Sequence, residues 1–173
     1  MHLFDTSAVS VAVNPRAPKH AVIQALLGGT SLFADEVFLS AVTLAEMQAG
    51  LQMLKYREPP PSAQSIEDVR RKIELAGRLG TILPVTHHVA AEHAALKVAY
   101  ARKFAPNKLK GAGLKSKPVE LWHDGINAAT LNVTENDLWI AATALAHDLV
   151  LVTDDRDHVR MKDADPRLKL LLL

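Results

Sequence analysis

Residues 149–153 (LVLVT) form an apolar run that is followed at once by three aspartates, Asp154, Asp155 and Asp157. A strand that is apolar on both faces is typical of a parallel sheet with helices on each side, whereas a half-exposed antiparallel strand alternates apolar and polar residues. The run therefore predicts a central strand of a helix-covered sheet. The sudden change to carboxylates has two explanations, a solvent-exposed loop or a metal site.

The rest of the chain repeats this alternation of short apolar runs and longer helical patterns. We expect strands at residues 2–4, 37–40, 81–85, 149–153 and 168–173, and helices at 17–27, from 43 to the prolines at 59–61, 65–79, 89–104 and 137–146. Alternating strands and helices indicate an α/β fold with a central, mostly parallel sheet. The chain has 173 residues, 49% of them apolar, which is enough for one domain with a buried core.

Several classes of protein are excluded by composition. The chain contains no cysteine, which rules out disulfides, cysteine-based zinc sites and thiol catalysis, and fits a reducing cytoplasm. The N-terminal sequence MHLFDTSAVS lacks the basic and apolar regions of a secretion signal. No apolar run approaches the ~20 residues that a membrane span needs. We therefore expect a cytoplasmic protein without a membrane partner, and the net charge of +1 leaves other partners open.

Four acidic residues are expected at one edge of the sheet, the edge formed by the carboxyl ends of the strands. Ligands of open parallel sheets bind beyond this edge. Asp5 ends the first strand, and Glu46 lies one turn into the helix that follows the second. Asp137 lies at the start of the helix before the last central strand, and Asp155 lies just beyond that strand. Their shared location favours a site over a chance distribution.

Each acidic residue also has a structural explanation. Glu46 completes a capping box with Thr43 (TLAE). Asp137 suits the first turn of a helix, where Thr134 or Asn136 would be the cap. The aspartates at 154, 155 and 157 fit a solvated turn, whereas for Asp5 no capping role is evident.

Carboxylates at close quarters repel one another, so a cluster must take up protons or bind cations. Oxygen ligands of this kind suit Mg²⁺ or Mn²⁺. One or two such ions lower the pKa of a bound water and hold a phosphodiester for in-line attack. The sequence therefore leads to the hypothesis of metal-assisted phosphodiester hydrolysis.

Three blocks, LFDTSAV, LSAVTLAEMQAGL and ENDLWIAATALAHDLVLVTDDRDH, resemble the PIN-domain family, most closely its VapC-type toxin branch. They cover about the first fifty residues and residues 135–158. The resemblance implies one domain over residues 1–173 with a three-layer α/β/α fold. It also implies an Mg²⁺- or Mn²⁺-dependent endoribonuclease that cuts RNA and is blocked by a small antitoxin protein.

Carried over by position, the resemblance assigns the catalytic and metal-binding roles to Asp5, Glu46, Asp137 and Asp155. It assigns supporting roles to Ser7, Thr153 and Asp157. Asp154 is left outside this set. The chain departs from the family pattern in a stretch before Asp137 that is longer by about twenty residues, and in His158-Val159, where an aromatic residue is common.

We interpret the longer stretch as an irregular basic insertion at about residues 105–133. From Arg102 to Lys117 the chain has several basic residues and no acidic residue. One explanation is a solvated loop. The other is a contact with the RNA backbone through Lys108, Lys110 and Lys115, since lysines along a groove neutralise phosphates.

The histidines and the C-terminal run are given structural roles. His87, His88 and His93 form no HExxH pattern, so a zinc site is not predicted. His158 is expected at the surface. The final LKLLLL is expected to be an edge strand or a contact with a partner, and a homodimer is expected.

Two rival functions share part of this pattern. A phosphatase of the haloacid-dehalogenase type also begins with an aspartate after the first strand, but it requires a second aspartate where this chain has Ser7. The alternative that remains is a non-catalytic RNA-binding or interaction module that retains the PIN fold. An RNA cleavage assay with and without EDTA separates this module from the nuclease.

Overall fold

The computed structural model describes residues 1–28, 36–110, 117–127 and 131–173. Its core is a five-stranded parallel sheet with the strand order β3-β2-β1-β4-β5. The strands are β1 (His2–Phe4), β2 (Val37–Ser40), β3 (Thr81–Leu83), β4 (Val150–Thr153) and β5 (Lys169–Leu172). All of these strands were predicted, and β5 is the edge strand expected from the C-terminal LKLLLL.

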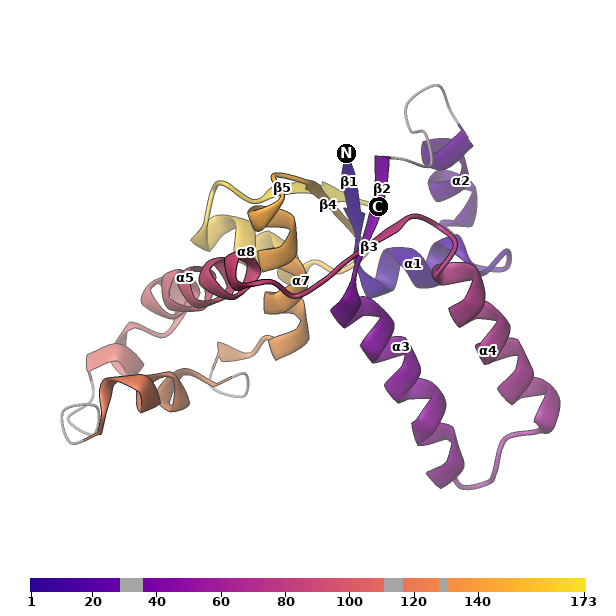
Figure 1. Cartoon of the computed structure of the whole chain (residues 1–173), viewed down its shortest axis with the longest axis horizontal. Helices are drawn as coiled ribbons and strands as arrows, with labels where there is room; N and C mark the ends of the chain where they lie inside the picture. Colours follow the sequence, from indigo (N-terminus) through magenta and orange to yellow (C-terminus); the bar gives the residue numbers. More distant parts are fainter. Residues whose placement is uncertain (29–35, 111–116, 128–130) are drawn as a thin grey trace.

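Helices cover both faces of the sheet (Figure 1). They are α1 (Thr6–Ala12), α2 (His20–Gly28), α3 (Ala41–Met53), α4 (Ala63–Ala76), α5 (His87–Phe104), α7 (Glu135–Ala146) and α8 (Asp157–Ala164). Helices α5, α7 and α8 lie on one side of the sheet, and α1 to α4 lie on the other. The three-layer α/β/α prediction is therefore confirmed.

The alternation of side chains along the strands explains why both faces need cover. In β1, Leu3 belongs to the core on the side of α5 and α7, and its neighbour Phe4 belongs to the core on the side of α1 and α2. Leu151 and Val152 of β4 divide in the same way. All four are fully buried, so an apolar residue is required at successive positions, as in other helix-covered parallel sheets.

The strand register places the functional edge. Phe4 pairs with both Leu39 of β2 and Val152 of β4. The residues that follow these three partners therefore leave the sheet at the same level. They are Asp5, Ser40 and Thr153.

The basic stretch is more ordered than predicted. It includes two short 3-10 helices, η3 (Pro106–Lys110) and η5 (Val119–Ile126). Ile126, Leu131 and Val133 are buried in the core on the α5 and α7 side. The expectation of irregular structure is therefore wrong for η3 and η5, whereas the insertion at about residues 105–133 stays a prediction. In the described residues, no helix is long and apolar enough to cross a membrane.

Candidate functional site

Asp5 follows β1 directly and caps the N-terminus of α1. Its carboxylate accepts a hydrogen bond of 2.7 Å from the backbone N–H of Ala8. The hydroxyls of Ser7 and Thr153 donate to it at 2.8 Å and 2.5 Å. The expectation that Asp5 has no capping role is therefore wrong: α1 begins at Thr6, the residue after it.

The environment of Asp5 acts on its pKa in two opposite directions. Burial raises the pKa, because the charged form loses its hydration. The Ala8 N–H and the Thr153 hydroxyl lower it, because both donate to the ionised carboxylate. The residue is only 3% exposed. Its side chain is thus held in one position by donors from two elements of the fold.

Glu46 is directed toward its neighbours α1 and α7 and does not cap its own helix. Helix α3 begins at Ala41 with Ser40 as the N-cap, so Thr43 lies inside the helix and is buried. The predicted capping box is therefore wrong. The Glu46 carboxylate accepts hydrogen bonds from the hydroxyl of Thr6 and, at 2.9 Å, from the side-chain amide of Asn136.

Asp137 lies in the first turn of α7, where Thr134 is the N-cap, as predicted. The Thr134 hydroxyl donates to the Asp137 carboxylate at 2.5 Å and accepts from its backbone N–H at 3.1 Å. Burial is the main cause that raises the pKa of Asp137, and the negative charges of Glu46 and Asp155 raise it further. Asp137 is therefore close enough to both Glu46 and Asp155 to be repelled by each.

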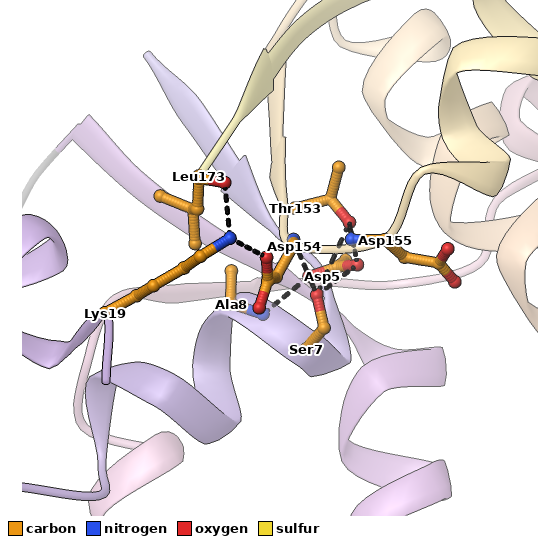
Figure 2. A network of polar contacts seen from close by, with 8 residues as sticks. All are labelled: Asp5, Ser7, Ala8, Lys19, Thr153, Asp154, Asp155 and Leu173. Atoms are coloured by element: carbon orange, nitrogen blue, oxygen red, sulfur yellow. Dashed lines mark hydrogen bonds and ion pairs between the residues drawn. The ribbon is translucent and has the colours of Figure 1, made fainter. Parts of the chain in front are cut away.

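The loop after β4 separates its aspartates into different environments (Figure 2). Asp154 forms an ion pair with Lys19, whose ammonium group also donates to the backbone carbonyl of Leu173 at 2.6 Å. The Asp155 carboxylate accepts from the backbone N–H of Asp157 at 2.9 Å. In Figure 2 it points away from Asp5. The Lys19 contact explains why Asp154 stands apart from the acidic set.

His158 is fully buried, so its expected position at the surface is wrong. It belongs to α8, a helix that was not predicted, and this helix turns the imidazole inward. Its Nδ1 lies 3.5 Å from the hydroxyl of Thr153. Through Thr153 it contacts the network around Asp5.

Several contacts of the candidate site carry no recognisable sequence signal. Thr6 and Asn136 hold Glu46, and Lys19 holds Asp154 from a position 135 residues away in the chain. Asn136 could have been found, because it precedes Asp137 in the same helical turn. The other contacts depend on how distant elements pack.

The chemistry of the donor set fits a divalent cation, although the side chains are not closed around one. Carboxylate oxygens are the ligands that Mg²⁺ and Mn²⁺ prefer, and the repulsion that acts on Asp137 is the kind that a cation offsets. Within residues 1–28, 36–110, 117–127 and 131–173, however, no group of three acidic or histidine side chains is close enough to hold a metal ion as it stands. Asp155, which bonds to the start of α8, would have to turn.

Two of the three predicted RNA-contacting lysines, Lys108 and Lys110, lie in η3. Lys108 and Lys110 are exposed in that 3-10 helix. Lys115 lies outside the described residues. The position of this basic group is therefore defined for two of its three members.

Comparisons with known proteins agree with this architecture. A family model described as PIN domain matches residues 3–164. Ribonuclease VapC4 of Mycobacterium tuberculosis (strain ATCC 25618 / H37Rv) is 37% identical over 68 residues, which cover 38% of this chain and 48% of that protein. The chain thus spans about half the length of this curated relative.

Two solved structures match nearly the whole chain. FitAcB from Neisseria gonorrhoeae has a TM-score of 0.63 at 24% identity, covering 99% of this chain and 96% of its own. VapBC2 from Rickettsia felis, bound to a DNA fragment from its promoter, has a TM-score of 0.60 at 19% identity, covering 99% of this chain and 97% of its own. At these identities the likeness establishes a shared fold.

Proposed function

The chain belongs to the PIN domain family, and on this premise we propose that it is a metal-dependent endoribonuclease that hydrolyses phosphodiester bonds in RNA. The observation that carries the proposal is that Asp137 lies within the electrostatic reach of both Glu46 and Asp155, at the sheet edge that also bears Asp5. Gathering like charges lowers the stability of a fold, so such a cluster is expected where a cation and a phosphate are bound.

Four side chains would hold Mg²⁺ or Mn²⁺, directly or through waters: Asp5, Glu46, Asp137 and Asp155. When bound, the cation supplies a Lewis acid that lowers the pKa of a water molecule and neutralises charge on the phosphate. Ser7 and Thr153 orient the carboxylate of Asp5 by donating to it. Asp157 supports the site through its backbone N–H, which fixes Asp155.

The hydrogen bonds at the site indicate what each carboxylate must do on binding. Asp5 is already fixed by three donors. Glu46 is held by Thr6 and Asn136. Asp155, which accepts from the Asp157 N–H, would have to leave that bond in order to join Asp5 around a cation.

The expected partners follow from the same family. We propose that a small antitoxin protein binds and blocks the chain, in the cytoplasm, because one structural neighbour, VapBC-5 from Mycobacterium tuberculosis, belongs to a family of toxin-antitoxin systems and the matching curated protein is a VapC ribonuclease. We also propose that the chain forms a homodimer. Co-expression with the product of a neighbouring short reading frame, followed by co-purification, tests the first of these proposals.

The nuclease is separated from a non-catalytic RNA-binding module by one assay. Purified protein is incubated with end-labelled single-stranded RNA in Mg²⁺ or Mn²⁺, in EDTA, and in EDTA followed by excess metal. Cleavage that stops in EDTA and returns with metal supports the proposal. RNA that is bound but stays intact with either metal identifies the module.

A further inference from the structure

A cavity lies beside the first turn of α7. It has a volume of about 430 Å³ and is lined by residues of α5, η5 and α7. Its lining includes Glu135, two residues before Asp137. Since a helix advances about 100° per residue, side chains two apart lie on nearly opposite sides of the helix. The cavity and the acidic edge therefore flank the same helical turn.

The walls of this cavity are flat and largely apolar. His93 and Trp139 stack with their ring centres 3.8 Å apart and their planes inclined by 8°. Ala94 and Val98, one turn apart on α5, and Ile126 of η5 complete the apolar lining. The volume lies in the range of pockets that bind small planar molecules.

The charges of Lys97 and Glu135 nearly cancel in the cavity, and His93 and His123 are the other polar residues of its lining. The ammonium group of Lys97 lies 3.0 Å from both carboxylate oxygens of Glu135, and Lys97 is only 8% exposed. His93 lies beside the same carboxylate, with 2.8 Å between its Nε2 and the nearer oxygen. Burial lowers the pKa of His93, which keeps its imidazole neutral near pH 7. A phosphate group gains little from such a pocket, whereas an uncharged ring with hydrogen-bonding edges fits it.

The first turn of α7 links the cavity to the acidic edge. Glu135 faces the cavity, Asn136 donates to Glu46 at 2.9 Å, and Asp137 belongs to the acidic set. The separation is about the width of one helix, ~10–12 Å with side chains. A single RNA strand crosses this distance within a few nucleotides.

We propose that this cavity holds one nucleobase of the RNA strand, close in sequence to the phosphodiester bond at the acidic edge. The proposal rests on the proposed nuclease function and deepens it, because it identifies where the enzyme selects its RNA sequence. Bases of single-stranded RNA stack on aromatic side chains and are read through hydrogen bonds to their edges. The ammonium group of Lys97 and the carboxylate of Glu135 provide a donor and an acceptor side by side.

The first test uses free nucleosides, which carry no phosphate and therefore do not require the acidic site. Adenosine, guanosine, cytidine and uridine are each titrated into isotope-labelled protein, and the indole N–H signal of Trp139 is followed by NMR. That signal is identified with Trp122→Phe, because the chain has two tryptophans. We expect a saturable shift with at least one nucleoside and none with ribose.

A matched pair of variants locates the binding. Ala94 lines the cavity and is exposed, so Ala94→Phe fills the space without disturbing the buried core. Ala95 is exposed on the same helix and does not line the cavity, so Ala95→Phe is the control. We expect nucleoside affinity to fall roughly tenfold or more in the first variant and to stay within about twofold in the second. Val98→Phe gives an independent block if Ala94→Phe folds poorly.

The second test connects the cavity to cleavage. The parent protein is given a pool of random-sequence RNA, and the products are sequenced. We expect a base preference at a fixed position near the cut, which Ala94→Phe removes and Ala95→Phe retains. Absence of a nucleoside shift, or equal shifts in both variants, overturns the inference even if RNA is cut. Nucleoside binding without any RNA cleavage instead overturns the proposed function and leaves a base-binding pocket.

Discussion

The Thr153 hydroxyl donates a hydrogen bond of 2.5 Å to the carboxylate of Asp5, although the two residues are 148 positions apart in the chain. The same oxygen accepts from the backbone N–H of Asp155 at 2.8 Å. One side chain at the end of β4 therefore fixes both the aspartate that ends β1 and the loop that bears the last acidic residue.

Thr153→Val removes this hydroxyl and keeps the shape of the side chain. We expect the free energy of unfolding to fall by about 1.5–3 kcal/mol, because the variant lacks a buried hydrogen bond to a carboxylate. RNA cleavage should also slow, because Asp5 then has one donor fewer. Urea unfolding and single-turnover cleavage measure the two effects.

Thr143→Val is the control for this change. Thr143 is buried too; its hydroxyl donates to the carbonyl of Trp139 within α7 and lies 3.2 Å from the hydroxyl of Ser40, the N-cap of α3. The variant should be less stable by about 1 kcal/mol and should cleave RNA at the parental rate. If cleavage slowed equally in the two variants, the hydrogen bond from Thr153 to Asp5 would not be what cleavage depends on.

A second prediction concerns the basic group in and after η3. Changing Lys108, Lys110 and Lys115 together to Ala should weaken RNA binding and flatten its dependence on salt. The slope of log affinity against log salt should fall by roughly 0.7 for each phosphate that the variant no longer neutralises. A control variant with Lys55, Arg57 and Arg70 changed to Ala removes the same charge from the α3 and α4 region. An unchanged slope in the first variant would exclude an RNA contact there.

Substitution by alanine should have opposite effects on stability at Gly80 and at Gly50. A Cβ atom on Gly80 would lie 2.1 Å from the backbone carbonyl oxygen of Val37, so Gly80→Ala must displace β2 or β3. We expect the unfolding free energy to fall by about 1–3 kcal/mol. Gly50, inside α3, has open space around it, and Gly50→Ala should gain ~0.5–1 kcal/mol. Equal stability of the two variants in urea would contradict the close approach at Gly80.

Stability should fall in acid through Asp165. Hydrogen bonds from Arg167 lower the pKa of Asp165 below its ordinary value. A carboxylate with a lowered pKa in the folded state stabilises the fold above its unfolded pKa of about 3.9, and this stability is lost as the pH falls through the lowered value. Arg167→Ala should therefore lower the unfolding free energy by about 1 kcal/mol at pH 7, since Arg167 is largely exposed.

The control for this ion pair is Arg70→Ala, which breaks an exposed pair with Glu67 at 3.5 Å. It should change the unfolding free energy little at any pH. The stability of Arg167→Ala should approach that of the parent as the pH falls through the lowered pKa of Asp165. A difference that persists undiminished in acid would mean that Arg167 stabilises the fold by packing alone.

The strands and the acidic edge could be predicted because they depend on local patterns. Strands buried on both faces leave continuous apolar runs, and parallel topology brings their carboxyl ends to one edge. Helix α1 was missed because it has only seven residues and follows β1 at once, so the capping role of Asp5 was missed with it. Helix α8 buries only His158 and Met161, too few residues for a periodic pattern.

The orientation of the acidic side chains could not be predicted, since it depends on contacts between distant parts of the chain. Lys19 pairs with Asp154, and Thr6 and Asn136 direct Glu46. Spacing in the sequence carries no information on these pairs. The same holds for the stacked His93 and Trp139, whose cavity no motif indicated.

The central claim is that the charge of Asp5 is required for RNA cleavage. Asp5→Asn removes that charge, while asparagine remains a good N-cap for α1, so the fold should be retained. Asp154→Asn is the matched control, because Asp154 is paired with Lys19 outside the acidic set. The measurement is the single-turnover cleavage rate of RNA in saturating Mn²⁺. We predict that the rate falls about 100-fold or more for Asp5→Asn, which corresponds to ~2.7 kcal/mol in the barrier. Asp154→Asn should cleave near the parental rate. Cleavage by folded Asp5→Asn at the parental rate would contradict a role of the Asp5 charge in catalysis.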